Sequence, residues 1–345
     1  MFPRLVPAWL ILAACCVASP WMNGAARAAE PLEKPALTLA VGGQALFYYL
    51  PLTIAERKGF FADAGLDVTI VDFPGGAKSL QALVGGSADI AAGSFEHVVH
   101  MRARGQRLQA IALLARYPLI VLAVSPSLAK AYRAPADLIG HPVGITAPGS
   151  STHLFLNSVL ARAGVSPTAV PVLGVGAGAG AVAAMRRGEI DALVHLDPVI
   201  HLLESTGAAT AVIDTRTPEG ARAVYGGEYH AACLYAKETF LAAHPRTAMA
   251  LVAAQDRALA WLASAREDAI LAVLPEAFIA GDPAEYRAAL AKNRAAWPPD
   301  ARLSRAGAEN VVRALAAFEP FVRDAQIEVD ALIDPRFAAA ARGGR

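Results

Sequence analysis

Two spacings of hydrophobic residues alternate along this chain and predict short strands separated by helices. Apolar runs at 37–41 and 68–71 are continuous enough for buried strands, and a helical stretch ending at Lys58-Gly59 lies between them. A further strand is predicted at 89–92. This order is typical of a parallel α/β sheet, whose ligands bind beyond the carboxyl ends of the strands.

The same order of elements recurs about one hundred residues later. Strands are predicted at 142–146, 170–173 and 191–195, with a helix over about 153–163. Five positions agree at a spacing of 102 residues: Gly76, Leu80, Leu83, Gly86 and Asp89 match Gly178, Val182, Met185, Gly188 and Asp191. The repeat predicts two similar βαβ lobes that face one another across a ligand cleft.

Two strand-like runs mark where the chain passes between the lobes. The first, at 119–124, is followed by Ser125-Pro126, and the second, at 229–236, precedes amphipathic helices predicted at 238–274 and 284–297. We therefore assign residues 36–121 plus 230–340 to lobe one and residues 122–229 to lobe two.

The first 28 residues have the features of an export signal. Arg4 supplies a positive start, residues 5–18 are uncharged but too short to span a bilayer, and residues 26–28 form a small-x-small cleavage pattern. A lipoprotein signal over residues 1–14, followed by a lipidated Cys15, is the alternative. Both interpretations predict a periplasmic protein, which would begin at Ala29 in the first case.

Composition excludes several functional classes. The chain has 31 Lys and Arg against 30 Asp and Glu, and the basic residues are scattered, so no nucleic-acid partner is predicted.

Cleavage after residue 28 would leave Cys233 as the single cysteine, which rules out an intramolecular disulfide. The strand-like context of Cys233 favours a small buried hydrophobe over a nucleophile.

Ordered motifs carry a family resemblance over about residues 36 to 265. They are Tyr49-Leu50-Pro51-Leu52, Glu56-Arg57-Lys58-Gly59-Phe60-Phe61, Ala64-Gly65-Leu66-Asp67-Val68, Gly85-Gly86-Ser87-Ala88-Asp89-Ile90-Ala91, Asp137-Leu138-Ile139-Gly140, residues 146–153 and Arg187-Gly188-Glu189-Ile190-Asp191-Ala192. Together they resemble the extracytoplasmic solute-binding proteins of ABC importers, in the SsuA/THI5-like (NMT1-like) branch. The resemblance implies a type II periplasmic-binding-protein fold, lobe closure on a small molecule, and an ABC permease as partner. A monomer without a cofactor is expected.

The candidate ligand site begins at the turn before the predicted helix at 153–163. Ser150, Ser151, Thr152 and His153 combine hydroxyls with free backbone N–H groups at the positive end of a helix, as an anionic head group requires. A plain N-cap is the alternative. The helix dipole contributes about 0.3–1 kcal/mol whereas micromolar binding needs about 8 kcal/mol, so the other lobe must contribute.

The remaining candidates follow predicted strands in both lobes. They are Gln44, Phe47, Tyr48, Gly76, Ser94 and Phe95 in lobe one, and Gly176, His195 and Asp197 in lobe two. Phe47 and Tyr48 could stack on an organic ligand or belong to the core. The family's ligands leave two classes open, a sulfonate-, taurine- or nitrate-like anion and a neutral thiamine pyrimidine precursor.

Other chemistries are weaker interpretations of the same residues. His195, Asp197 and His201 could bind a metal, but Asp197-Pro198 indicates a helix start and no second cluster completes a ligand set. We expect residues 96–100 on a helix surface. The glycines at 174–180 imitate a dinucleotide fingerprint, but only a short helix follows them. The pyridoxal-phosphate-dependent pyrimidine synthases of this branch use a cysteine-rich motif, so the single remaining cysteine disfavours such an enzyme. A solute sensor that docks on a membrane kinase is a further alternative, and it would use the same residues.

Overall fold

The computed structural model describes Met1, residues 30–279 and residues 281–343. The predicted export signal, its cleavage site and Cys15 lie outside the described residues. Residues 32–345 form one compact unit. Among the described helices, none combines the length and the apolar composition needed to cross a bilayer.

The first lobe contains a five-stranded sheet with the strand order β2-β1-β3-β10-β4. Strand β1 (Ala36–Val41) pairs in parallel with β2 (Asp67–Asp72) and β3 (Ile90–Ser94). Strand β10 (Ala232–Lys237) is antiparallel to β3 and to β4 (Leu108–Leu113). A strand that returns from the second lobe is therefore inserted between β3 and β4.

The second lobe repeats this plan with the order β7-β6-β8-β5-β9. Strand β6 (Val143–Ile145) pairs in parallel with β7 (Val172–Gly174) and β8 (Ala192–His195). Strand β5 (Val121–Val124) is antiparallel to β8 and to β9 (Thr210–Asp214). The predicted two-lobed α/β architecture is confirmed.

The prediction of purely parallel sheets is wrong, because each sheet contains one antiparallel strand. Strands β5 and β10 are the two runs that were predicted to mark the crossings, and each is the first strand after the chain enters a new lobe. An apolar run reveals that a segment is a buried strand but carries no information on its direction.

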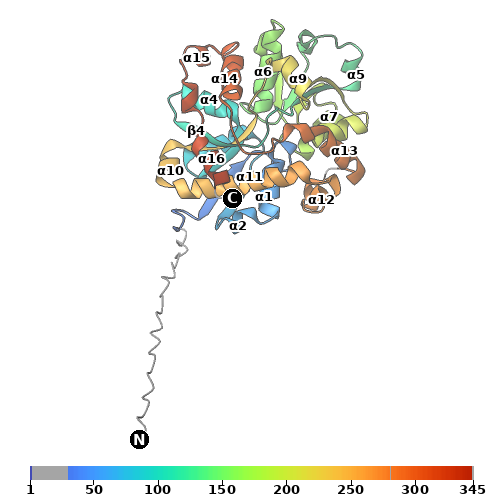
Figure 1. Ribbon diagram of the computed structural model, residues 1–345. Coiled ribbons are helices and arrows are strands. Elements are labelled where there is room, and N and C mark those ends of the chain that lie inside the picture. The colour runs from blue at the N-terminus through green and yellow to red at the C-terminus, as the bar shows by residue number, and fades with distance from the viewer. Residues whose placement is uncertain (2–29, 280, 344–345) are drawn as a thin grey trace. The chain divides into compact units, whose positions relative to one another are not determined.

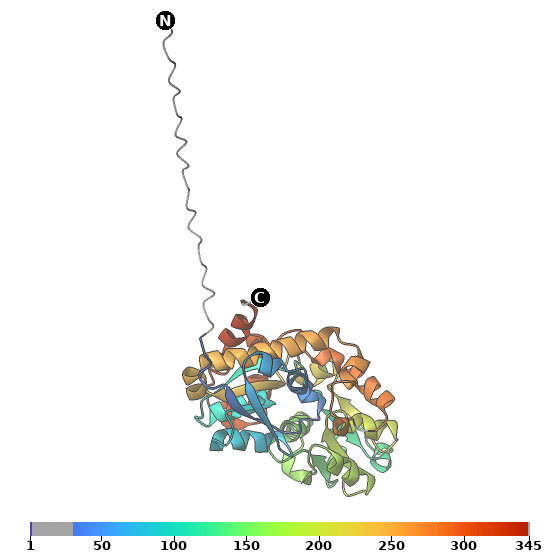
Figure 2. The same cartoon turned by 90° about the horizontal axis from the view of Figure 1, so that it is seen from below.

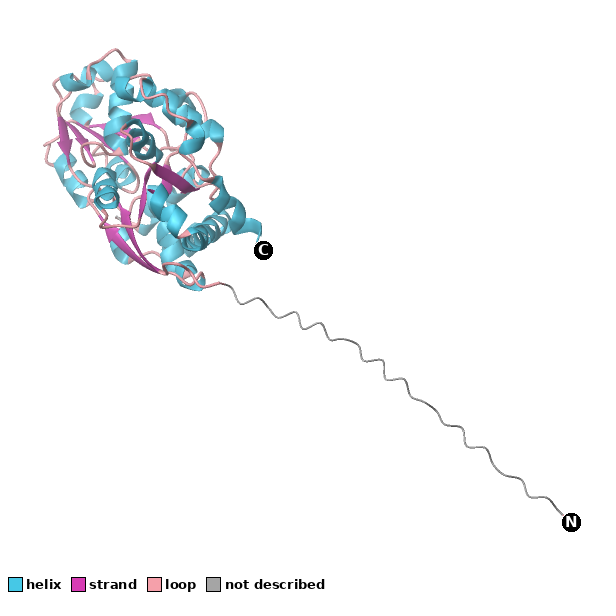
Figure 3. Cartoon of the chain, turned by 90° about the vertical axis from the view of Figure 1, so that its left-hand side faces the viewer, coloured by secondary structure: helices cyan, strands magenta, loops and turns pink. Residues whose placement is uncertain are grey.

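Helices flank both sheets (Figure 3). Their bounds are α1 (Leu50–Arg57), α2 (Phe60–Asp63), α3 (Gly76–Gly85), α4 (Phe95–Ala103), α5 (Pro126–Ala129), α6 (Ser151–Arg162), α7 (Ala179–Arg186), α8 (Val199–Ser205), α9 (Pro218–Tyr225), α10 (Glu238–Ala243), α11 (Pro245–Ser264), α12 (Glu267–Leu271), α13 (Pro283–Asn293), α14 (Arg305–Ala316), α15 (Pro320–Arg323) and α16 (Pro335–Gly343). In Figure 1, α4 and α10 lie to the left, α5, α7 and α9 to the right, and α11 along the bottom. The blue and the yellow-green elements also stay apart in the view from below (Figure 2).

The helix predicted over residues 238–274 is three helices in the structure. Helix α10 ends at Ala243, and α11 begins at Pro245 because proline, which lacks an N–H, fits only the first turn of a helix. Helix α12 follows a second break at Ala265. After it, α13 packs against α8 of the second lobe, so the C-terminal region contacts both lobes.

The carboxylate of Glu33 binds the first turn of α11. It accepts hydrogen bonds from the backbone N–H groups of Arg246 (3.1 Å) and Thr247 (2.9 Å) and from the Thr247 hydroxyl (3.1 Å). Burial by itself would raise the pKa of Glu33, but these bonds to the charged form lower it to about 2. Glu33 therefore stabilises the fold only while it is ionised.

Replacing Glu33 with glutamine should destabilise the protein in a pH-dependent way. The pKa is lower in the folded chain than in the unfolded one, so the contribution of Glu33 is complete above about pH 4.5 and is lost as the pH falls towards 2. We expect a loss of about 1–2 kcal/mol at pH 7 and a much smaller loss at pH 3. Urea unfolding of both proteins at each pH measures the two differences, and equal differences would contradict the assignment.

Candidate functional site

The loops at the carboxyl ends of the two sheets meet along one contact surface, which we call the seam. Hydrogen bonds join the lobes across it. The Ala77 N–H donates to Ser150 Oγ (3.0 Å), the Phe47 N–H to the Asp197 carbonyl (3.0 Å), and His97 Nε2 lies 3.3 Å from the Gly149 carbonyl. These bonds hold the two lobes in a closed arrangement.

Glycines allow the lobes to approach this closely. A Cβ atom at Gly75 would lie 2.9 Å from the Cβ of Ala147 and 3.1 Å from Ser150 Oγ, and one at Gly43 would lie 2.5 Å from the Cβ of Ala177. Contacts this short do not occur between real Cβ atoms. Any side chain at Gly75 would therefore push the two lobes apart.

Two of the hydroxyls predicted at the start of α6, those of Ser150 and Thr152, already have protein partners. Ser150 is buried, and its hydroxyl binds the N-terminus of α3 rather than its own helix. Thr152 Oγ1 accepts from the Thr146 N–H (3.1 Å) and contacts Thr146 Oγ1 (2.8 Å). His153 Nδ1 accepts from the Gly149 N–H (3.0 Å), and Ser151 is partly exposed.

The lobe-one candidates divide between the seam and the core. The ring of Phe47 is fully buried against Tyr286 and Trp297, whose indole N–H donates to the Phe47 carbonyl. Phe95 is also fully buried, with its ring edge to His230. The side chain of Gln44 is exposed and bonds Glu56. A Cβ at Gly76 would lie 3.1 Å from the His97 ring.

The lobe-two candidate His195 is bonded within its own lobe, whereas Asp197 also accepts hydrogen bonds from lobe one. His195 Nε2 lies 3.0 Å from the Gly176 carbonyl. The Asp197 carboxylate is fully buried and accepts from the Arg216 guanidinium (3.1 and 3.2 Å) and from Asn293 Nδ2 (2.6 Å). In the part of the chain that the structure describes, no three acidic, His or Cys side chains are grouped to hold a metal.

A buried carboxylate, that of Glu96, lies beside the candidate Ser94. Glu96 is 3% exposed, and it accepts from Tyr229 OH at 2.5 Å and from Ser94 Oγ at 2.7 Å. The Tyr229 ring stacks on Tyr225 with 3.9 Å between centroids, and the Tyr48 hydroxyl interacts with Ser94. We call these five residues the Glu96 cluster.

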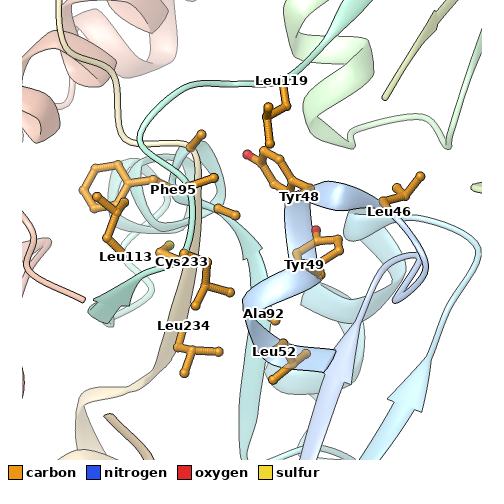
Figure 4. Packing of buried hydrophobic residues seen from close by; sticks show 14 of the residues in the cluster. Leu46, Tyr48, Tyr49, Leu52, Ala92, Phe95, Leu113, Leu119, Cys233 and Leu234 are labelled. Atoms are coloured by element: carbon orange, nitrogen blue, oxygen red, sulfur yellow. The ribbon is translucent and has the colours of Figure 1, made fainter. Parts of the chain in front are cut away.

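The Glu96 cluster draws on separate parts of the chain. Tyr48 lies in the short 3-10 helix after β1 (Figure 4), Ser94 and Glu96 lie where β3 meets α4, and Tyr225 ends α9 of the second lobe. Burial raises the pKa of Glu96, although the bonds from Tyr229 and Ser94 oppose this. The prediction that residues 96–100 lie on a helix surface is therefore wrong, because this stretch of α4 is covered by α14 and the seam.

His97 connects the two lobes as a neutral ring. Burial lowers its pKa to about 4, and the nearby His100 acts in the same direction. A carbonyl oxygen can only accept a hydrogen bond, so Nε2 carries the proton and donates a hydrogen bond to the Gly149 carbonyl. Nδ1 accepts a hydrogen bond from Tyr235 OH at 3.1 Å. This arrangement requires the neutral ring.

A cavity of about 680 Å³ opens beside His97, between the lobes. Its walls come from α3 and α4 of the first lobe and from the turn before α6 and α6 itself in the second. The polar groups that line it are Gln81, His97, His100, Arg104, His153, Asn157 and Glu319. Its volume lies in the range of small-molecule sites.

A model of the NMT1/THI5-like family matches residues 47–269. Among solved structures, a protein of Bordetella bronchiseptica RB50 is 45% identical, with a TM-score of 0.89 and coverage of 91% of this chain and 99% of that one. The alkanesulfonate-binding protein SsuA of Xanthomonas axonopodis pv. citri, bound to MOPS, is 23% identical, with a TM-score of 0.65 and coverage of 91% and 99%. The nitrate-binding protein NrtA of Synechocystis PCC 6803 is 15% identical, with a TM-score of 0.73 and coverage of 91% and 90%.

The similarities to SsuA and NrtA concern the fold, which is that of periplasmic binding proteins. A curated relative, YtlA of Bacillus subtilis (strain 168), carries the provisional name of a binding protein and is 32% identical over 99 residues. That match covers 29% of this chain and 30% of YtlA, so the chain spans less than a third of the length of this relative.

Proposed function

The chain belongs to the NMT1/THI5-like family, and on that premise we propose that it is the extracytoplasmic substrate-binding component of an ABC importer. It captures a small organic solute by closure of its two lobes and delivers the solute to a membrane permease. The observation that carries this proposal is the seam, where both sheets direct their carboxyl ends at shared polar groups beside a 680 Å³ cavity. We propose a periplasmic monomer, with lipid anchoring through Cys15 as the alternative form.

Two ligand classes compete for the seam. A sulfonate-, taurine- or nitrate-like anion would use the start of α6, and the names of SsuA and NrtA favour it by analogy. Such an anion would have to displace Ser150 Oγ from the Ala77 N–H. A thiamine pyrimidine precursor would instead use the tyrosines of the Glu96 cluster.

Cys233 supports a binding protein over a pyrimidine-synthase-like enzyme. Its thiol is fully buried in β10, and burial raises its pKa well above the usual value. Nucleophilic attack and metal ligation both need the thiolate, which this environment disfavours. The cysteine is therefore suited to packing rather than to chemistry.

A thermal-shift screen tests the proposed function. The probes are methanesulfonate, taurine, nitrate and 4-amino-5-hydroxymethyl-2-methylpyrimidine, with sodium chloride at equal ionic strength as the control. A probe at 100 times its dissociation constant adds about 2.7 kcal/mol of stability, which raises the melting temperature by several degrees. The absence of any shift at millimolar concentration of all four probes would contradict the proposal.

A further inference from the structure

Glu96 is a buried carboxylate without a cationic partner. Its two oxygens accept bonds from the neutral hydroxyls of Tyr229 and Ser94. No lysine or arginine in the described ranges forms an ion pair with it. Since buried carboxylates are otherwise almost always paired with a cation, this acid lacks the partner that its burial calls for.

The side chains that face Glu96 are mainly tyrosines, and the basic residues His100 and Arg162 also act on the cluster. Tyr48, Tyr225 and Tyr229 face it from the loop after β1, from α9 and from the second crossing, respectively. His100 lies one turn further along α4, but its Nε2 is 2.5 Å from a Glu319 oxygen and is therefore already paired with that carboxylate. The immediate surroundings of Glu96 are therefore rich in hydroxyls, and no cation bonds the carboxylate directly.

Neighbours of Glu96 line two cavities at the lobe boundary, although Glu96 itself lines neither. Its neighbours His97 and His100 line the 680 Å³ cavity, and Tyr225 lines a second cavity of about 370 Å³ between α6, α9 and α14. Glu96 belongs to the first lobe and Tyr225 to the second, so lobe opening would uncover the carboxylate. Closure would then place the aromatic pair over whatever is bound there.

Resting on the proposed function, we propose that Glu96 selects the ligand, which is a small organic solute that presents a hydrogen-bond-donating nitrogen to its carboxyl group. Amines, amidines and amino-substituted heterocycles meet this requirement. A sulfonate, nitrate or carboxylate would bring a second negative charge next to Glu96 in a site where screening is weak, so the seam rejects it. Charge-assisted bonds from N–H groups would supply the missing partner.

Four probes of matched shape test this proposal by titration calorimetry. Benzamidine and 4-aminopyrimidine carry N–H donors, whereas pyrimidine lacks one and benzenesulfonate is an anion. The wild-type protein should bind the two N–H probes at least tenfold more tightly than the other two. The Glu96→Gln variant keeps the shape of the side chain and should lose at least tenfold in affinity for benzamidine.

Two further variants keep the test decisive. Glu96→Asp covers the case in which Glu96→Gln fails to fold, because it retains the charge but withdraws it by one methylene group. It should bind the N–H probes more weakly than the wild type does and should still reject benzenesulfonate. Ser151→Asp places a charge at the start of α6, where aspartate is compatible with the helix. It should leave N–H probes unaffected, whereas a fall in their affinity would place them at α6.

The outcomes separate this inference from the function on which it rests. Tighter binding of benzenesulfonate than of benzamidine, or unchanged affinities in Glu96→Gln, would overturn the role of Glu96 and leave a binding protein for anions. Failure of all four probes to bind the folded wild-type protein, together with a blank thermal-shift screen, would overturn both proposals.

Discussion

Replacing Arg216 with methionine is expected to lower the free energy of unfolding by about 3–5 kcal/mol. The guanidinium is fully buried and binds three carboxylates, those of Asp197, Asp214 and Glu204. The substitution leaves the fully buried Asp197 carboxylate with the Asn293 amide as its remaining side-chain partner. An uncompensated buried charge costs far more than the loss of one hydrogen bond.

Arg187→Met is the matched control for this prediction. Arg187 pairs with Glu189 at 2.8 Å, but its side chain is 66% exposed, so its loss should cost less than about 1 kcal/mol. Arg216→Lys should fall between the two, because an ammonium group cannot reproduce the forked contacts of guanidinium. Urea unfolding monitored by tryptophan fluorescence measures all three, and similar losses for Arg216→Met and Arg187→Met would refute the assignment.

Replacing Gly75 with valine is expected to keep the lobes from closing and to weaken ligand binding at least tenfold, or about 1.4 kcal/mol. The new Cβ would lie 2.9 Å from the Cβ of Ala147 across the seam, and the two valine methyl groups need more room still. The backbone at Gly75 is extended, with φ 177°, so valine should not strain it. The variant should fold normally, and in the presence of ligand its radius of gyration should exceed that of the wild type.

Ala134→Val provides the control, because Ala134 is exposed, has a similarly extended backbone with φ −153°, and lies outside the 680 Å³ cavity. It should retain both the radius of gyration and the affinity of the wild type. The role of the seam in lobe closure would be contradicted if Gly75→Val closed and bound ligand as the wild type does, or if the two variants behaved alike.

The repeat in the sequence identified most of the fold but missed one edge strand of each sheet. The strands predicted from apolar runs correspond to β1, β2, β3, β5, β6, β7, β8 and β10. Strand β4 was missed because it and β5 form one nearly continuous apolar stretch over residues 108–124, interrupted mainly by residues 116–118. Strand β9 was missed because it is a half-exposed edge strand of only five residues.

Local pattern located the hydroxyls of the seam, since a turn between a strand and a helix is visible in the sequence. It could not show that Glu96 is buried, because its cover comes from Tyr225 and Tyr229, well over a hundred residues away. Asp197 illustrates the same limit. Its position after a strand is consistent with ligand binding, whereas its partner Arg216 follows another strand and becomes visible only in the folded sheet.

Small-angle scattering of the wild-type protein, alone and saturated with the tightest-binding probe, tests the central claim most directly. Two lobes joined by two chain crossings should open without ligand and close around it as hinged bodies, so the radius of gyration should fall on saturation. The Gly75→Val variant should show no such fall. An unchanged wild-type radius of gyration at proven saturation would contradict capture by lobe closure.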